Sequence, residues 1–315
     1  MKSNKITRIS FFTPVSSGTV ATAIASLLVG YCLFFSSCGS TEKLSEDTFK
    51  FSPEQRMVLG TYAGLPKLSN GRADLDKLIE QLKDLNANTY NWLIWQNEND
   101  WDDLKLFLPM ALKNRIAVWV SLVPPSESKP KAKWNSEPFG TDYIRWSEEI
   151  AKLSVNYPNL VAFSIDDFVH NLTFYTPEYV KKMMNEIDKI NPSLQFIPCS
   201  YYRQITADFA QKYAPLLDGI LFPYRAESEG GNLQNAELVE QEIAKLRSLF
   251  KGQMPIYIDV YLTAHSRLGA STPSYVEEVI RSGREHADGV LIYKHPDPVN
   301  DAEKYQIVKT GFVNN

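Results

Sequence analysis

Carboxyl groups lie within or at the end of two apolar segments of this 315-residue chain. Asp166 and Asp167 close the segment at residues 160–166, and Asp259 lies inside the segment at residues 255–262. A buried carboxyl costs free energy unless it is paired or hydrogen-bonded. These positions therefore favour a chemical role, although an arginine or backbone amides could hold Asp166 and Asp167 for structural reasons, and Asp259 could be a core ion-pair partner.

Side chains alternate between the two faces of a strand, which decides what each segment presents inward. In the first segment we expect bulky Val161, Phe163 and Ile165 to meet a helix layer, and Ala162, Ser164 and Asp166 to point inward. In the second, Tyr257, Asp259 and Tyr261 share the inward face. Two carboxyls that flank a bond are the machinery of glycoside hydrolysis, one as acid and the other as nucleophile or base. We therefore name Asp166, Asp167 and Asp259 as candidate catalytic residues.

Aromatic and polar side chains follow the other apolar segments. Aromatic rings with hydrogen-bonding tips suit a sugar, which has apolar faces and a polar edge. Trp134 lies in a long loop at residues 124–140 that could cover such a site. The candidate substrate-binding residues are Tyr62, Trp95, Glu98, Trp134, Tyr202, Tyr224, Arg225, Tyr293 and His295. If Asp166 is the nucleophile or stabiliser, the candidate proton donors are Asp167, Glu98 and Glu227.

Eight strand-like segments alternate with eight helix-like segments, the pattern of βα units around a parallel sheet. The strands are expected at 58–63, 89–95, 116–123, 160–166, 195–201, 219–224, 255–262 and 289–293, and the helices at 73–85, 102–114, 142–156, 177–190, 207–216, 236–250, 273–286 and 301–309. Eight units predict an α/β chain with one (β/α)8 TIM barrel over residues 55–315, whose active site lies at the carboxyl ends of the strands. An open doubly wound sheet is the alternative.

The N-terminus predicts export. Residues 1–37 combine a basic start, an apolar run and small residues before Cys38, which is typical of a secretory signal peptide. The sequence Phe35-Ser36-Ser37-Cys38 resembles the lipobox of bacterial lipoproteins, although Phe35 departs from the usual leucine. The resemblance implies lipidation of Cys38, for example with palmitate, a tether at residues 38–54 and an extracytoplasmic, membrane-anchored location in the cell envelope. A transmembrane anchor is the alternative, but the run is short for one.

The eight units, the Ser164-Ile165-Asp166-Asp167-Phe168 sequence and the aromatic rim together resemble TIM-barrel glycoside hydrolases. The chitinase-like and α-galactosidase-like groups are the most similar, because acids at the end of their fourth strand carry catalysis. The chitinase-type glutamate is missing here, where Phe168 and Val169 stand, and no Asn-Glu pair marks this strand. The resemblance therefore implies the fold, a carbohydrate substrate and the location of the acids, and no specific family.

Composition and motifs limit the other function classes. A net charge of -4 gives no reason to expect a nucleic-acid partner. The chain has no phosphate-binding or dinucleotide fingerprint, so we expect no cofactor. We interpret Cys199 as a small core residue. One alternative function is a non-catalytic carbohydrate-binding lipoprotein, and another is a metal-dependent hydrolase, whose candidate ligands are Asp166, Asp167, His170, His265, His295 and Asp297.

Overall fold

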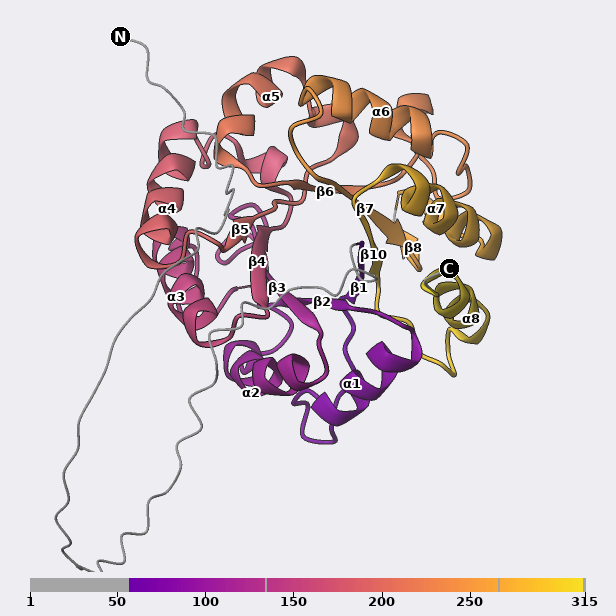
Figure 1. Ribbon diagram of the computed structural model, residues 1–315, viewed down its shortest axis with the longest axis horizontal. Helices are drawn as coiled ribbons and strands as arrows, with labels where there is room; N and C mark the ends of the chain where they lie inside the picture. The colour runs from indigo at the N-terminus through magenta and orange to yellow at the C-terminus, as the bar shows by residue number, and fades with distance from the viewer. Residues whose placement is uncertain (1–56, 134, 266, 314–315) are drawn as a thin grey trace, which may run out of the picture. The chain divides into compact units, whose positions relative to one another are not determined.

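Parallel strands form the centre of the computed structural model, which describes residues 57–133, 135–265 and 267–313. The strands are β1 (Val58–Tyr62), β2 (Thr89–Leu93), β3 (Ala117–Leu122), β4 (Leu160–Ile165), β5 (Gln195–Phe196), β6 (Ile220–Pro223), β7 (Ile256–Tyr261) and β10 (Gly289–Tyr293). Their order in the sheet is β5-β4-β3-β2-β1-β10-β7-β6. An isolated parallel bridge joins Cys199, in the segment after β5, to Leu221 of β6 and completes the ring seen in Figure 1.

A helix follows each of these strands and packs on the outside of the ring (Figure 1). The helices are α1 (Leu75–Asp84), α2 (Asp100–Lys113), α3 (Tyr143–Asn156), α4 (Pro177–Ile190), α5 (Ala207–Tyr213), α6 (Val239–Leu249), α7 (Pro273–His286) and α8 (Ala302–Gly311). Thr176 and Thr272 cap α4 and α7, with a proline in the first turn of each helix. The predicted (β/α)8 TIM-barrel fold is confirmed.

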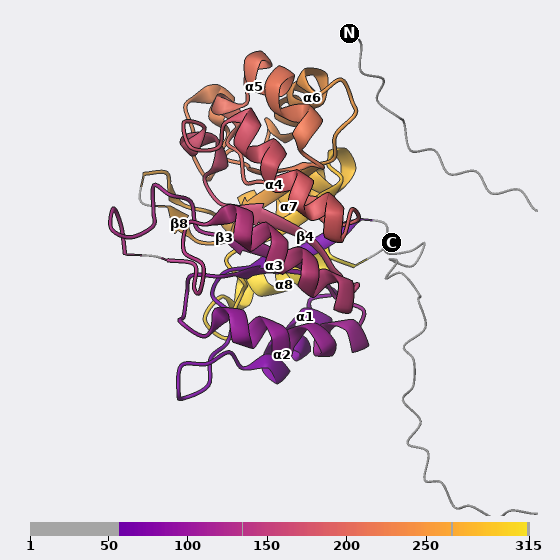
Figure 2. The same cartoon turned by 90° about the vertical axis from the view of Figure 1, so that its left-hand side faces the viewer.

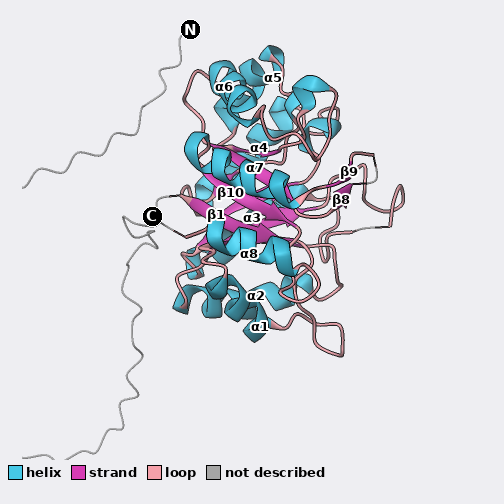
Figure 3. Ribbon diagram, turned by 90° about the vertical axis from the view of Figure 1, so that its right-hand side faces the viewer, coloured by secondary structure: helices cyan, strands magenta, loops and turns pink. Residues whose placement is uncertain are grey.

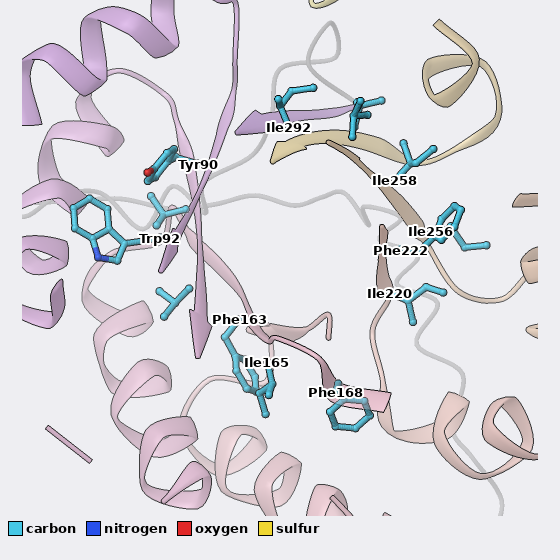
Figure 4. Packing of buried hydrophobic residues seen from close by; sticks show 14 of the residues in the cluster. Tyr90, Trp92, Phe163, Ile165, Phe168, Ile220, Phe222, Ile256, Ile258 and Ile292 are labelled. Atoms are coloured by element: carbon cyan, nitrogen blue, oxygen red, sulfur yellow. The ribbon is translucent and has the colours of Figure 1, made fainter. Parts of the chain in front are cut away.

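Alternating side chains divide the apolar core into two layers. The outward side chains of the strands pack against the helices; Figure 4 labels Tyr90, Trp92, Phe163, Ile165, Ile220, Phe222, Ile256, Ile258 and Ile292 among them, together with Phe168 of the 3-10 helix after β4. The inward side chains fill the barrel and include Tyr62, Leu93, Trp119, Ala162, Ile197, Leu221, Tyr257 and Leu291. Because this inner cluster fills the ring, the barrel is packed rather than hollow.

Val161 does not lie where strand alternation predicted, which was against the helix layer. It packs against the inner cluster rather than the helix layer. The pairing of β3 with β4 shifts at this point, from Val118 opposite Leu160 to Trp119 opposite Ala162, so Val161 is the extra residue of a β-bulge. Beyond the bulge the alternation resumes, with Phe163 and Ile165 in the outer layer as expected.

A short hairpin that the sequence did not predict follows β7. It consists of β8 (Ala264–His265) and β9 (Gly269–Ala270), and it projects from the same end of the barrel as the loop after β3 (Figures 2 and 3). Lys304 of α8 closes its base, because the Nζ donates to the carbonyl oxygens of Leu262 (2.6 Å) and Ser271 (2.7 Å). No helix in the described ranges is long and apolar enough to cross a membrane.

Candidate active site

A cavity of about 510 Å³ opens at the carboxyl ends of the strands. Each strand of the barrel sheet except β3 contributes residues near or after its carboxyl end, and the loop after β3 supplies Glu127. The polar and aromatic side chains that line the cavity are Tyr62, Trp95, Gln96, Glu127, Asp166, Asp167, His170, Tyr201, Arg203, Arg225, Glu227, Asp259, Tyr261, His265, Arg267 and Tyr293. Residues far apart in sequence therefore meet at the end of the barrel where (β/α)8 enzymes carry out their chemistry.

The turn after β4 presents two adjacent carboxyls to this cavity. Asp166 continues the inward face of β4, and its Oδ1 accepts a hydrogen bond from the backbone N–H of Asp167 at 3.0 Å. Asp167 has a left-handed backbone, with φ 44° and ψ 35°. This conformation is uncommon for a residue with a side chain, and such residues cluster at functional sites. It ends the strand and lets both carboxyls line the same cavity.

The surroundings drive the pKa values of this pair apart. Burial raises the pKa of Asp166 to about 7, and the charges of Asp167 and Glu127 act in the same direction. Burial also acts to raise the pKa of Asp167, but interactions with His170 and Tyr201 outweigh it and lower that pKa below its ordinary value. His170 Nδ1 lies 3.6 Å from Asp167 Oδ1. Near neutral pH the pair therefore holds one ionised carboxylate and one carboxyl poised to give up a proton.

Asp259 lies deeper in the same cavity and is only 1% exposed. The hydroxyl of Tyr62 donates to its Oδ2 at 2.7 Å, whereas its Oδ1 has no hydrogen-bond partner among the described residues. Burial raises the pKa of Asp259 to about 8, with a smaller contribution from Asp166. The raised pKa favours the protonated form of Asp259 at neutral pH, and Asp259 forms no ion pair within the described part of the chain.

The rim residues predicted from the sequence divide into two groups. Tyr62, Trp95, Arg225 and Tyr293 line the cavity together with the candidate acid Glu227. The rings of Tyr62 and Tyr293 lie 5.2 Å apart, and that of Tyr261 lies 5.3 Å from Tyr293, so the three form one aromatic wall. This wall has the mixed apolar and hydrogen-bonding character that a sugar ring requires.

Glu227 is held by the protein. Its Oε1 pairs with the Arg225 guanidinium, and its Oε2 accepts from the backbone N–H of Arg203 at 2.9 Å. The Arg225 guanidinium also lies 4.1 Å from the centre of the Tyr201 ring. Because both oxygens of Glu227 are engaged by protein donors, we expect it to shape the sixth loop and not to exchange a proton with a ligand.

Four predicted residues do not line the cavity. Glu98 is exposed on the loop before α2, which leaves it without access to a bond held beside Asp166. Tyr202 and Tyr224 belong to the outward face; Tyr224 is buried and donates its hydroxyl proton to the Asn235 carbonyl at 2.9 Å. His295 is buried between β1 and α1. Trp134 lies outside the described residues.

His295 is a core residue, because both ring nitrogens have buried partners. Nδ1 lies 2.8 Å from Thr61 Oγ1, and Nε2 lies 3.0 Å from Gln81 Oε1. Burial lowers the pKa of His295 to about 4, so the imidazole is neutral near pH 7. These contacts explain why His295 is directed away from the cavity although it follows β10.

Replacing His295 therefore tests a structural role. In His295→Leu, Thr61 and Gln81 lose their partners, and each orphaned buried group costs about 1–3 kcal/mol. We expect the free energy of unfolding in urea to fall by about 2–6 kcal/mol, with ligand affinity at the cavity unchanged. His286→Leu, on the partly exposed end of α7, is the control and is expected to change little. Loss of cavity binding with full stability would contradict this assignment.

Glu127 is a cavity residue that the sequence did not predict, whereas the prediction that Cys199 is a small buried residue is confirmed. Glu127 lies in a loop without periodicity, so nothing in the pattern placed it beside Asp167. Cys199 is buried as expected, but it also lines the cavity and interacts with Asp166. Within the described residues, no group of three or more His, Cys, Asp or Glu side chains is arranged to hold a metal ion. The residues proposed for the metal-dependent alternative are therefore not gathered into one ligand set.

Comparison with known proteins supports the fold. No family model matches the chain, and no curated protein sequence does. One similar solved structure is a glucosidase from Croceicoccus marinus, with 12% identity and a TM-score of 0.55 over 75% of this chain and 59% of that one. A second is a β-galacturonidase from Eisenbergiella tayi bound to galacturonate, with 14% identity and a TM-score of 0.55 over 81% of this chain and 50% of that one. A third is an endoglucanase from Pseudomonas stutzeri, with 12% identity and a TM-score of 0.54 over 82% of this chain and 94% of that one. The chain spans less than two thirds of the first two. It shares the TIM-barrel fold with these solved structures.

Proposed function

We propose that the chain is a glycoside hydrolase whose substrate binds in the cavity at the carboxyl ends of the strands. Asp166 donates a proton to the leaving glycosidic oxygen, and Asp167 acts as the nucleophile or as the base that activates water. The observation that carries this proposal is the adjacency of two cavity-lining carboxyls whose pKa values are driven in opposite directions. This proposal exchanges the roles considered from the sequence, in which Asp166 would be the nucleophile or stabiliser and Asp167 a candidate proton donor.

The rest of the cavity supports a carbohydrate. The aromatic wall of Tyr62, Tyr293 and Tyr261 offers apolar faces, with Trp95 also on the lining. Arg203, Arg225 and Gln96 add donors for hydroxyl groups. A few polar groups on an aromatic surface match the two kinds of surface that a sugar presents. The TIM-barrel fold shared with glycosidases agrees with this proposal, while the substrate is decided by the side chains of the cavity.

The test is a panel of aryl glycosides and polysaccharides offered to the purified full-length protein. We expect hydrolysis of at least one member, at a rate that a chelator leaves unchanged. Binding without hydrolysis would favour the carbohydrate-binding alternative. Loss of activity with the chelator, restored by a divalent metal, would favour the metal-dependent one. Neither binding nor hydrolysis across the panel would contradict the proposal.

We further propose that the protein is a lipoprotein anchored to a membrane of the cell envelope on its extracytoplasmic side. The support is the N-terminal sequence, which lies outside the described residues. In a bacterial host fed labelled palmitate, we expect the label on the wild-type chain and on Cys199→Ala. The variant Cys38→Ala is expected to remain unlabelled. Label that persists in Cys38→Ala would contradict the anchor.

A further inference from the structure

Three arginines line one side of the cavity. Arg203 follows β5, Arg225 follows β6, and Arg267 lies in the hairpin after β7. Strands β5, β6 and β7 are consecutive in the closed ring, and the turn with Asp166 and Asp167 follows the neighbouring strand β4. A substrate that reacts at the two aspartates therefore extends over a part of the cavity that is rich in guanidinium groups.

Two of these three positive charges are not balanced by the protein. The Arg225 guanidinium pairs with Glu227 and lies 4.1 Å from the centre of the Tyr201 ring. Arg203 and Arg267 are both exposed, and neither forms an ion pair within the described part of the chain. Because Glu227 carries a single charge, which Arg225 takes up, the charges of Arg203 and Arg267 remain available to a ligand.

Arg203 is anchored at one end of its guanidinium. Its backbone N–H donates to Glu227 Oε2 at 2.9 Å, and its Nε donates to the Glu227 carbonyl oxygen at 2.7 Å. The two terminal amino groups donate no hydrogen bond to any residue that the structure describes. An anchored guanidinium loses less conformational freedom on binding, and its parallel N–H groups match two oxygens of one anionic group.

The hairpin brings Arg267 to the same side of the cavity. A β-carbon on Gly231 would lie 3.6 Å from Leu268 Cδ2, so the hairpin rests against the segment after β6. The backbone N–H of Arg267 donates to His265 Nδ1 at 3.2 Å across the turn. Arg203 and Arg267 therefore both lie beside the segment at residues 225–231, one bonded to its Glu227 and the other next to the residue that meets Gly231.

We propose that the substrate is an acidic glycan, and that Arg203 and Arg267 bind its anionic group, either a uronic carboxylate or a sulfate ester. A neutral sugar would leave both guanidinium charges without a counter-ion in the cavity. The carboxylate of Asp167 repels an anion, so it directs the charged group of the glycan away from β4 and toward the two arginines. This inference rests on the proposed function for the kind of ligand, a glycan.

The test compares each acidic oligosaccharide with its own neutralised form. Oligomers of galacturonate, glucuronate and mannuronate are paired with their methyl esters, and sulfated galactan oligomers with their desulfated forms. Calorimetric titration of the full-length protein is expected to give at least one acidic member a Kd about tenfold or more below that of its neutral partner, the usual effect of hydrogen bonds between charged groups. The pair that shows the preference distinguishes carboxylate from sulfate. The preference is expected to shrink at high salt, because both arginines are exposed.

Single variants assign the preference to these side chains. Arg267→Gln and Arg203→Gln are each expected to weaken binding of the acidic member about tenfold and to leave the neutral member within about twofold. Arg267→Gln changes an exposed side chain without a hydrogen bond in the described ranges, so it stays informative if Arg203→Gln does not fold. Arg281→Gln removes the same charge from the outer side of α7 and is the matched control.

Hydrolysis is measured on the same samples, which separates this inference from the proposed function. An acidic preference that depends on Arg267 but occurs without hydrolysis would uphold the inference and contradict the proposed glycosidase. Hydrolysis or binding of neutral glycans with no acidic preference would overturn the inference alone. A preference that survives in Arg267→Gln and Arg203→Gln, one that Arg281→Gln also abolishes, or no binding by any member of the panel would overturn it as well.

Discussion

Asp166→Asn is expected to lower kcat by about 10²–10⁴-fold, the usual contribution of a positioned general acid. Asparagine has the shape of a protonated carboxyl and its amide still donates hydrogen bonds, but it cannot transfer a proton to the leaving group as an acid. The variant is therefore expected to fold normally and to bind the glycan with a Kd within about twofold of wild type, because only the transition state loses an interaction. Steady-state kinetics and calorimetric titration on the same preparation measure the two effects separately.

The pH dependence sharpens this prediction. Asp166 must be protonated to act, and its pKa lies at about 7, so kcat/KM is expected to fall as the pH rises through that value. Asp188→Asn makes the same change on the exposed side of α4 and is expected to retain wild-type rates and pH profile. Full activity in Asp166→Asn would remove Asp166 from the chemistry. Equal loss of binding and rate would show a role in holding the substrate instead.

Asp259→Asn is expected to change the pH dependence of stability. The pKa of Asp259 is raised to about 8 in the folded protein, so the native state binds a proton that the unfolded chain releases from about pH 4 upward. Stability from this group is fully present below that range and is lost as the pH rises to about 8. The slope is at most about 1.4 kcal/mol per pH unit for one proton. Asp259→Asn removes the titration and is expected to flatten the curve.

The effect of Asp259 on stability is best measured between about pH 6.5 and 8. His295 contributes in the opposite sense, because its pKa is lowered to about 4 and its stabilisation is lost as the pH falls below about 6.5. Above that pH, Asp166 adds a slope of the same sign as Asp259 up to about pH 7. Urea unfolding at several pH values is therefore expected to show a shallower decline in Asp259→Asn than in wild type or Asp188→Asn. Parallel curves would mean that Asp259 is already ionised in the native state.

The fold was predictable because its physics is local. Apolar residues alternate in the strands and recur at helical spacing between them, and capping threonines mark the start of α4 and α7. The same alternation placed Asp166 and Asp259 on the inner face. The same alternation also separates the residues after β5 and β6. Ile197 and Leu221 face inward, and Tyr201 and Arg225, each four residues further on, share that face and line the cavity. Tyr202 and Tyr224 lie at the alternate positions and face outward.

Other parts of the site depend on contacts that no local pattern records. Glu127 and Asp167 line the same cavity although they lie 40 positions apart in the sequence. Asn171 joins their segments by hydrogen bonds to Ser126 and to the Asp167 carbonyl. Both partners of His295 are distant in sequence, Thr61 on β1 and Gln81 on α1. The pKa values of Asp166 and Asp167 depend on burial and on side chains from several strands. Such features follow from closure of the barrel, which brings all strand ends together.

A crystal structure of Asp166→Asn with a glycan bound, chosen from the panel above, tests the central claim most directly. We expect a sugar ring on the wall formed by Tyr62, Tyr293 and Tyr261, with the glycosidic oxygen within about 3 Å of the residue 166 side chain. The Asp167 carboxylate is expected to contact the anomeric carbon of the sugar or a water molecule beside that carbon. A glycan bound elsewhere on the barrel, or one whose glycosidic oxygen lies beyond reach of both side chains, would contradict the proposed chemistry.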